Sequence, residues 1–268
     1  MPTHDLCNRR VLITGGSSGV GEAVARLFAK AGAQVVITAR RRDTLEAVAQ
    51  SIGATALVAD VSQADDCHRL IAEASAVLGG LDILINNAGC HHRGDFANQD
   101  ADALAQMVDT NLRAPVMLSH LALPWLTQAP RGAIVNVGSV AGRMAVPGSA
   151  TYSATKAGLR TLTYALAEEL RGSSVSVSVV SPGPIATDFI LSDIDAVTDL
   201  TFSQPMSTTD EIAQLVLDCV ADGRTERTKP ASTRVMTTLG YLFPSLPRTL
   251  RPLLAAKGRR AKKRYRRG

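Results

Sequence analysis

The sequence predicts an α/β fold in which one doubly wound parallel sheet carries helices on both faces. Two observations support this prediction. Strand-like apolar runs alternate with helix-like segments along the chain, which is the pattern of one layered α/β structure. The 268 residues are 46% hydrophobic but only 4% aromatic, so the core must consist of Ala, Val, Leu and Ile, as in parallel sheets covered by helices. Residues 1–255 are therefore expected to form one domain.

The first predicted unit is a strand over 11–13, a glycine-rich turn over 14–21 and a helix over 20–31 that ends at Gly32. Glycines allow a tight turn and a close approach of the backbone to a pyrophosphate. The helix N-terminus adds free N–H groups and a positive dipole. This order is typical of a dinucleotide-binding loop, although a glycine turn can also simply link a strand to a helix.

The second predicted strand, 34–38, is followed by Ala39 and then by Arg40, Arg41 and Arg42. An NAD site usually has an acid after this strand to bind the ribose 2′-hydroxyl, and none is present. The arginines could instead bind a 2′-phosphate, which favours NADP, with Arg40 first and Arg41 second. The alternative is that these arginines are solvent-exposed residues that lead into the N-terminus of the next helix.

A third strand is expected over 56–59 and a fourth over 81–85, with a helix between them. Asp60 and Val61 follow the third strand. Asp60 either faces the adenine amino group or caps the next helix together with Ser62. The fourth strand ends in Asn86-Asn87-Ala88-Gly89, where two amides suit either loop fixation or cofactor contact.

Residues 100–129 are predicted to form a long helix with a break near Pro115. Asn111 lies inside it. Since asparagine is a poor residue for a helix interior, a local hydrogen-bonding role is expected there.

A fifth strand over 133–137 delivers Ser139 at its carboxyl end, and the helix over 152–170 then begins with Tyr152-Ser153-Ala154-Thr155-Lys156. Tyr152 and Lys156 are four residues apart, so they share one face of the helix. A nearby ammonium would lower the pKa of a phenol and make it a useful general acid/base. Such a pair also occurs as ordinary surface residues. A sixth strand, 175–180, follows.

Taken together, these motifs closely resemble the short-chain dehydrogenase/reductase family, in its single-domain, NADP-preferring branch. The resemblance runs from about Val11 to Thr187 and more loosely to Ala221. It implies a Rossmann-like fold with the site at the carboxyl ends of the strands. The matching pieces are Thr14-Gly15 through Gly19 and Gly21, Asp60, Asn86-Asn87-Ala88-Gly89, Asn111, Ser139, Tyr152 with Lys156, and Pro182-Gly183 with Thr187.

The resemblance also implies roles for these residues. Tyr152 would exchange a proton with the substrate oxygen, Ser139 would hydrogen-bond that oxygen, and Lys156 would hold the nicotinamide ribose. Asn111 would keep a water-linked proton route open beside Lys156. Together with the motif analysis, the expected cofactor-binding residues are Gly15, Ser17, Ser18, Gly19, Val20, Gly21, Arg40, Arg41, Asp60, Val61, Asn87, Ala88, Gly89, Tyr152, Lys156, Pro182, Gly183, Ile185 and Thr187.

Beyond Thr187 the resemblance weakens. Residues 183–208 are expected to be a substrate-covering segment, with a surface loop as the alternative, and a helix is expected from about 208 to 220. Residues 224–238 are polar and only Val235-Met236 is strand-like. A seventh strand is therefore doubtful, and a homodimer is expected rather than a tetramer.

The C-terminal region is apolar over 239–254 and strongly basic after it. Residues 257–268 contain eight lysines and arginines and no acid, so the net charge of +5 leaves −3 for the rest of the chain. We expect residues 256–268 to be a disordered tail beside a short packed helix. Contact with an anionic membrane surface is an alternative, and specific nucleic-acid binding is not expected.

Other site classes find little support. Four scattered cysteines and the pair His91-His92 lack metal-ligand spacing, so no metal is expected. The N-terminus has no signal pattern and no run could cross a membrane, which points to the cytoplasm.

The leading hypothesis is an NADP-dependent oxidoreductase, with NAD less favoured, that interconverts an alcohol and a ketone or aldehyde. Its substrate is expected to be lipophilic. Epimerase chemistry is disfavoured because no extra substrate domain is present. The alternative from another class is a catalytically weak nucleotide-binding or scaffold protein that uses its basic tail to bind a partner or a membrane.

Overall fold

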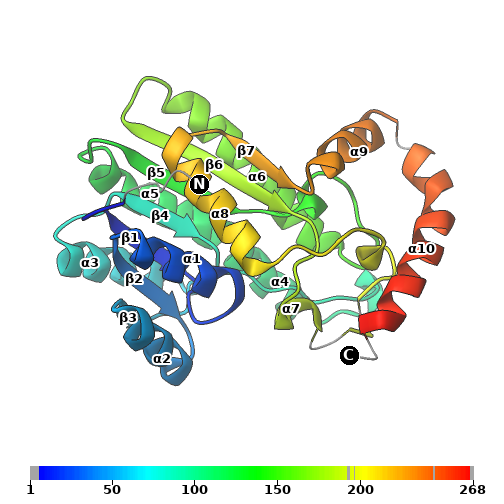
Figure 1. Ribbon diagram of the computed structural model, residues 1–268, viewed down its shortest axis with the longest axis horizontal. Coiled ribbons are helices and arrows are strands. Elements are labelled where there is room, and N and C mark those ends of the chain that lie inside the picture. The colour runs from blue at the N-terminus through cyan, green and yellow to red at the C-terminus, as the bar shows by residue number, and fades with distance from the viewer. Residues whose placement is uncertain (1–5, 192–193, 196, 244, 266–268) are drawn as a thin grey trace.

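A computed structural model describes residues 6–191, 194–195, 197–243 and 245–265. Its centre is a seven-stranded parallel sheet in the order β3-β2-β1-β4-β5-β6-β7, which confirms the predicted fold class (Figure 1). The strands are β1 (Arg10–Thr14), β2 (Gln34–Ala39), β3 (Thr55–Val58), β4 (Ile83–Asn86), β5 (Gly132–Val137), β6 (Val175–Pro182) and β7 (Glu226–Lys229).

The strand order reverses between β1 and β4. The chain first builds outward from β1 through β2 to β3, then returns beside β1 and builds the other way from β4 to β7. At such a reversal the loops after the two central strands part in opposite directions and leave a crevice at the carboxyl end of the sheet. The expected site residues follow strands that end at this edge.

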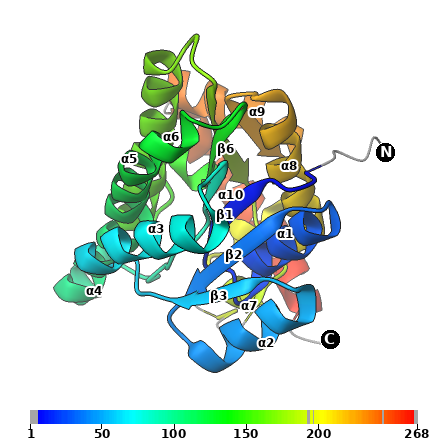
Figure 2. The same cartoon turned by 90° about the vertical axis from the view of Figure 1, so that its left-hand side faces the viewer.

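Helices cover both faces of the sheet (Figure 2). The α-helices are α1 (Gly19–Lys30), α2 (Arg42–Ile52), α3 (Ala64–Leu78), α4 (Ala101–Val108), α5 (Ala114–Leu126), α6 (Ala150–Glu169), α7 (Asp188–Leu191), α8 (Thr209–Asp222), α9 (Ala231–Leu242) and α10 (Ser245–Tyr265). Short 3-10 turns are η1 (Phe96–Asn98), η3 (Val140–Gly142) and η4 (Thr201–Ser203).

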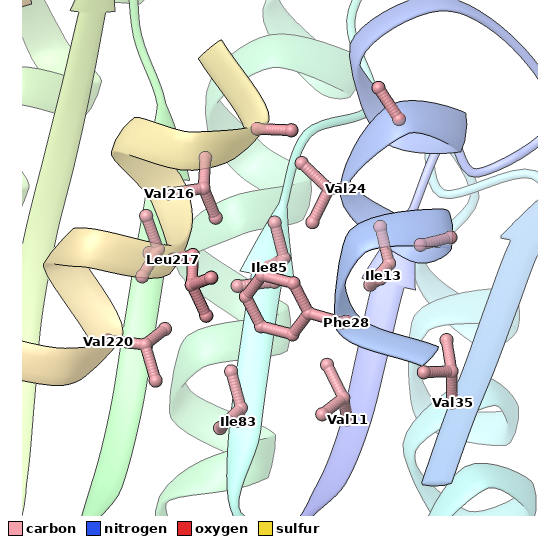
Figure 3. Packing of buried hydrophobic residues seen from close by; sticks show 14 of the residues in the cluster. Val11, Ile13, Val24, Phe28, Val35, Ile83, Ile85, Val216, Leu217 and Val220 are labelled. Atoms are coloured by element: carbon pink, nitrogen blue, oxygen red, sulfur yellow. The ribbon is translucent and has the colours of Figure 1, made fainter. Parts of the chain in front are cut away.

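The core has two parts, one on each face. On one face Phe28 of α1 is fully buried among Ile83 and Ile85 of the sheet and Val216 and Leu217 of α8 (Figure 3). On the other face the sheet packs against α3 and α5. As the sequence predicts, this core is almost entirely aliphatic. It fixes the strand ends that carry the site.

The long helix expected over 100–129 is interrupted near Pro115, as predicted, but the interruption is a π-helical turn that the sequence did not indicate. A π-helical turn, η2 (Asp109–Arg113), separates α4 from α5 and contains Asn111. The break therefore precedes Pro115. That proline lies in the first turn of α5, directly after the π-helical turn, and its missing N–H cannot pair with a carbonyl of that turn.

A seventh strand does form, contrary to the sequence-based doubt. Strand β7 pairs in parallel with the end of β6. It shows no apolar run because its side chains make ion pairs: Glu226 with Arg143 and Arg160, and Lys229 with Glu211. The expected strand-like pair Val235-Met236 lies instead in α9.

The C-terminal region also differs from expectation. In place of a disordered tail from residue 256, α10 continues to Tyr265, and residues 266–268 lie outside the described part. The Lys262 ammonium is buried and donates to the backbone carbonyls of Asp195 and Val197, at 3.3 and 2.6 Å. None of the described helices is both long enough and apolar enough to cross a membrane.

Candidate active site

The carboxyl edge of the sheet opens into a cavity of about 950 Å³. All of the predicted site residues line it except Gly21 and Asn111, which lie behind its wall. The covering segment lines the opposite side through Phe189, Ile190 and neighbouring residues, and Leu254 of α10 joins it there. The cavity therefore brings the glycine turn, the Tyr152 helix and the covering segment together.

The glycine turn leaves an open cradle at the N-terminus of α1. Gly15 and Gly19 have φ of +67° and +59°, a region that side chains disfavour. A Cβ at Gly21 would lie 2.1 Å from the carbonyl oxygen of Gly15, so only glycine fits there. No side chain caps the helix at Ser18, which leaves its first N–H groups to face a ligand. This cradle suits a pyrophosphate.

Arg40 and Arg41 line the cavity beyond β2, at the side where a ribose bound to this cradle would extend. Arg42 differs from them, because it forms an ion pair with Glu46 on the surface of α2 at 3.0 Å. Within the described chain no carboxylate pairs with Arg40 or Arg41. Two cationic side chains are thus left facing the cavity.

Asp60 and Asn87 both line the cavity, and both also hold the loops around it. Asp60 accepts hydrogen bonds from the N–H and hydroxyl of Ser62, at 3.0 and 2.7 Å, so it caps the turn after β3. The Asn87 amide donates to the carbonyl oxygens of Thr14 and Gly15, at 2.9 and 3.2 Å. Of the two roles left open for Asn87, the structure shows loop fixation.

Ser139 and Tyr152 meet at the floor of the cavity. Ser139 follows β5, and its hydroxyl accepts the Ala141 N–H at 3.1 Å in η3. Gly142 brings η3 close to α6, because a Cβ there would lie 2.5 Å from the carbonyl oxygen of Lys156. The Ser139 hydroxyl also hydrogen-bonds Tyr152, which favours its ionised form.

Lys156 is buried one helical turn from Tyr152. Its ammonium donates to the Val137 carbonyl at 2.9 Å and lies 5.8 Å from the Tyr152 ring centroid. Burial lowers the pKa of Lys156 to about 8.

The pKa of Tyr152 departs from the sequence-based prediction. We expected the Lys156 ammonium to lower it. In the protein without cofactor, burial raises the pKa of Tyr152 above its ordinary value. This effect of burial is larger than the lowering of the pKa by the hydrogen bond from Ser139. The phenol is therefore held protonated at neutral pH.

Asn111 is fully buried behind Gly89 and makes the local bonds expected of it. Its Oδ1 accepts the Cys90 N–H and its Nδ2 donates to the Cys90 carbonyl, both at 2.9 Å. A Cβ at Gly89 would lie 3.2 Å from Asn111 Oδ1 and 3.7 Å from Lys156 Nζ. Asn111 and Lys156 thus flank Gly89, and π-helical turns of this kind often occur at functional sites.

Sequence reasoning considered His91 only as a metal ligand, and the structure gives it a different place. Its ring stacks on the Tyr152 ring, with centroids 4.0 Å apart and planes 15° apart. Its Nε2 lies 3.0 Å from the Ser149 hydroxyl. Burial lowers the pKa of His91 to about 3, so the ring is neutral. The sequence did contain a signal for this role: His91 comes shortly after Asn86-Asn87-Ala88-Gly89, at the carboxyl end of a strand, where site residues are expected.

The covering segment adds a third ring to this stack. Phe189 of α7 lies 6.2 Å from the His91 ring and 6.4 Å from the Tyr152 ring, centroid to centroid. Arg93 holds Phe189 in place by donating to its carbonyl at 2.9 Å. Among the described residues, no three His, Cys, Asp or Glu side chains are grouped so as to bind a metal ion.

Comparison with known proteins places the chain in a family. Residues 9–196 match the family described as short chain dehydrogenase. A ketoacyl reductase, HetN, of Nostoc is 33% identical over 255 residues, which are 90% of this chain and 87% of that protein. An uncharacterized oxidoreductase of Staphylococcus saprophyticus is 36% identical over 204 residues, which are 74% of this chain and 83% of that protein.

Solved structures agree with this match. A dehydrogenase/reductase from Sinorhizobium meliloti superposes with a TM-score of 0.77 at 30% identity, covering 84% of this chain and 94% of that one. A short chain dehydrogenase from Burkholderia cenocepacia, solved in complex with NADP, has a TM-score of 0.75 at 31% identity, covering 84% and 97%. The chain therefore belongs to the short-chain dehydrogenase/reductase family of oxidoreductases, whose fold it shares.

Proposed function

We propose that the protein is an NADP-dependent oxidoreductase that interconverts an alcohol and a ketone or aldehyde, with Tyr152 as the general acid/base. The observation that carries this proposal is the meeting of Ser139, Tyr152 and Lys156 with the glycine cradle in one cavity. The scaffold alternative is not favoured, because the relatives matched along most of the chain are named reductases and oxidoreductases.

In the proposed reduction, Tyr152 gives its proton to the substrate oxygen. The raised pKa suits this step, since the phenol is protonated at neutral pH. The Ser139 hydroxyl donates a hydrogen bond to the same oxygen and stabilises the charge that develops there. When bound, the nicotinamide cofactor supplies the hydride to the carbonyl carbon or, in the reverse direction, accepts it.

Lys156 and Asn111 support the proton transfer in this proposal. Lys156 lies beside the ring of Tyr152 and is positioned to hold the cofactor ribose. With a pKa of about 8 it releases or accepts a proton near neutral pH. Asn111 lies across Gly89 from it and would connect the site to a proton route through water.

The preference for NADP over NAD is proposed from Arg40 and Arg41. Two arginines without carboxylate partners suit a 2′-phosphate, which an arginine can bind through two parallel hydrogen bonds. We expect Arg40→Ala to weaken NADPH binding by about tenfold to a hundredfold while NADH binding changes by less than about threefold. Fluorescence titration of both cofactors measures this directly.

Arg42→Ala is the matched control, because this neighbouring arginine already pairs with Glu46 on the helix surface. Its affinity for NADPH should equal that of the wild type. Equal affinity of the wild type for NADH and NADPH would refute the proposed 2′-phosphate site. If neither cofactor bound, the oxidoreductase proposal itself would fail.

His91 is proposed as a positioning residue for Tyr152. Its ring covers the Tyr152 ring, and its bond to Ser149 fixes the angle of the stack. We expect His91→Ala to lower kcat about fivefold, since a stacked pair contributes roughly 1 kcal/mol. His91→Phe, which can still stack, should restore most of it. His91→Phe should keep the limbs of the pH–rate profile where the wild type has them. In His91→Ala the phenol loses part of its burial, so the limb set by Tyr152 should move to lower pH.

A lipophilic substrate is proposed from the cavity wall that faces Tyr152. Its apolar members are Phe189, Ile190, Val197, Leu200 and Leu254, which lie beside the polar Thr198, Thr201, Ser203 and Gln204. A fatty-chain or steroid-like carbonyl would bury its apolar surface there. The Nostoc relative is named a ketoacyl reductase, which agrees with a fatty-chain substrate.

We also propose a homo-oligomer in the cytoplasm. Helices α4 and α5 leave large apolar side chains exposed at Val108, Val116 and Trp125, as a subunit interface would. The formation of β7 removes the reason for preferring a dimer over a tetramer. Sedimentation of the purified protein measures the state.

A further inference from the structure

Exposed apolar side chains gather on α9. Val235 and Leu239 are four residues apart and so lie on one face, with Met236 beside them, and Phe243 follows directly after the last residue of the helix. Each is between 41 and 62% exposed, although all four are large enough to fill a core. Leu253 of α10 is 71% exposed. A contiguous apolar strip on a folded domain marks an interaction surface rather than a chance distribution.

The same part of the chain is strongly cationic. The last 42 residues, from Arg227 onward, contain thirteen lysines and arginines and no acidic residue. On α10 the exposed cations include Lys257, Arg260 and Lys263. Helices α9 and α10 lie together at one end of the molecule, away from β1 to β3 (Figure 1). Apolar and cationic groups thus occupy neighbouring helices at that end.

The inner side of α10 is already occupied by the domain. Gly258 packs so closely that a Cβ would lie 1.7 Å from the Asp199 carbonyl oxygen. Ala261 joins the apolar cluster of Ile190, Val197 and Phe202. Buried Lys262 donates to backbone carbonyls of the covering segment. The helix is therefore fixed in orientation, and the exposed Lys257, Arg260 and Lys263 are left on its other sides.

We propose that α9 and the outer side of α10 form a docking surface for an anionic lipid bilayer. Apolar side chains enter the headgroup and acyl boundary, while lysines and arginines attract anionic lipid headgroups. The apolar strip on α9 and the exposed cations of α10 would bind the same partner, since packing within the domain explains neither of them. The protein would lie on the membrane surface and not cross it.

A second copy of the chain fits this surface poorly. Pairing two such ends would bring the exposed cations of two α10 helices together, Lys257, Arg260 and Lys263 among them, with no acid in α9 or α10, and like charges in contact are repulsive. A nucleic acid would bind the cations, but it offers no apolar surface against which the strip on α9 could be buried. An anionic bilayer satisfies both the charge and the apolar surface.

Docking here would bring the lipid close to the cavity. Helix α10 holds the covering segment through Lys262, and its Leu254 lines the cavity wall. A lipophilic substrate dissolved in the bilayer would then lie near the side of the site that this segment covers. This consequence rests on the proposed function, whereas the docking surface itself does not.

Vesicle binding of the full chain tests the proposal without any measurement of turnover. The probes are vesicles of phosphatidylcholine alone and vesicles that also contain about 30% phosphatidylglycerol, at physiological salt. We expect co-sedimentation with the anionic vesicles only. The triple variant Lys257→Gln, Arg260→Gln, Lys263→Gln should bind about a hundredfold more weakly, given roughly fivefold for each cation.

A second variant tests the apolar strip. Val235→Ser, Met236→Ser, Leu239→Ser should bind at least about tenfold more weakly, because these side chains no longer enter the bilayer. These three side chains are exposed, so the variant should fold and bind NADPH as the wild type does. Retained NADPH binding separates a failure of docking from a failure of the site.

Control variants change exposed residues elsewhere: three cations in one variant and two apolar side chains in the other. Arg26→Gln, Arg69→Gln, Arg171→Gln removes the same charge from α1, α3 and the end of α6. Val77→Ser with Phe96→Ser removes exposed apolar side chains from α3 and η1. Both controls should bind anionic vesicles like the wild type.

Three results would overturn the proposal. The first is no binding of the wild type to anionic vesicles. The second is unchanged binding of the α9 variant, which would reduce the interaction to general attraction between opposite charges. The third is a fall in oligomeric state for the α9 variant in sedimentation velocity, which would show that another copy covers the strip.

Discussion

Replacing Tyr152 with phenylalanine is expected to lower kcat for carbonyl reduction by about a thousandfold, the usual range for loss of a general acid. The change removes one hydroxyl and keeps the ring, so the stack on His91 and the contact with Phe189 persist. Binding of NADPH should change by less than about threefold. Steady-state kinetics with a panel of aldehydes and ketones, together with cofactor titration, measures both quantities.

Tyr164→Phe is the control for this substitution. Tyr164 lies on the same helix, but its hydroxyl donates to Glu226 at 2.8 Å, away from the cavity. Its loss should leave kcat within about twofold and lower stability by about 1 kcal/mol. A Tyr152→Phe variant that retained the wild-type rate would refute the proposed general acid. Loss of NADPH binding in that variant would point to a structural role instead.

The fold could be predicted because its strands are buried on both faces. Runs such as Val11-Leu12-Ile13 must be continuously apolar, so β1, β2, β4, β5 and β6 are visible in the sequence, and the shorter apolar run of β3 could also be predicted. Strand β7 was not visible. It lies at the edge of the sheet, and its polar side chains form ion pairs with residues distant in the sequence. The local sequence pattern does not reveal such partners.

The site also has a part that the sequence predicts and a part that it does not. Loop and helix-start residues such as Gly15, Ser139 and Tyr152 could be located because each follows a recognisable strand or begins a helix. The direction of the Tyr152 pKa shift could not, because it depends on burial by parts of the chain far away in sequence. His91 and Phe189, which enclose the phenol, come from two loops whose approach only the fold determines.

Replacing Glu226 with glutamine is expected to lower the free energy of unfolding by about 3 to 5 kcal/mol, the range for breaking a buried ion pair. Its carboxylate accepts hydrogen bonds from Arg143, Arg160, Tyr164 and Ser181, at 2.5 to 3.0 Å. The Arg143 side chain is only 8% exposed, so the substitution leaves a buried cation without its partner. Thermal unfolding should shift down by roughly 10 °C.

Loss of the Glu226 carboxylate also affects α6, the helix that carries Tyr152. Glu226 joins β7 to α6 through Arg160 and Tyr164, and Arg143 continues the network to Thr237 of α9 at 2.9 Å. Glu168→Gln is the control, because its pair with Arg171 at the end of α6 is 67% exposed on the acid side and 76% on the basic side. That variant should melt within about 1 °C of the wild type.

The pH dependence gives a second, independent test of Glu226. Burial alone would raise its pKa, but the hydrogen bonds from Arg160, Arg143, Ser181 and Tyr164 lower it from 4.5 to about 2. A carboxylate with a lowered folded pKa contributes its full stability above the unfolded value of 4.5, and that contribution is lost as pH falls toward 2. Its size is about 3 kcal/mol at neutral pH.

The glutamine variant cannot titrate at this position, so it lacks this acid-dependent loss. The difference in urea midpoint between wild type and Glu226→Gln should therefore be largest above pH 5 or so and shrink steadily below it. A difference that stayed constant down to about pH 2 would show that the carboxylate charge is not what joins β7 to α6. In that case the network would act through shape and neutral hydrogen bonds, and the polar sequence of β7 would need another explanation.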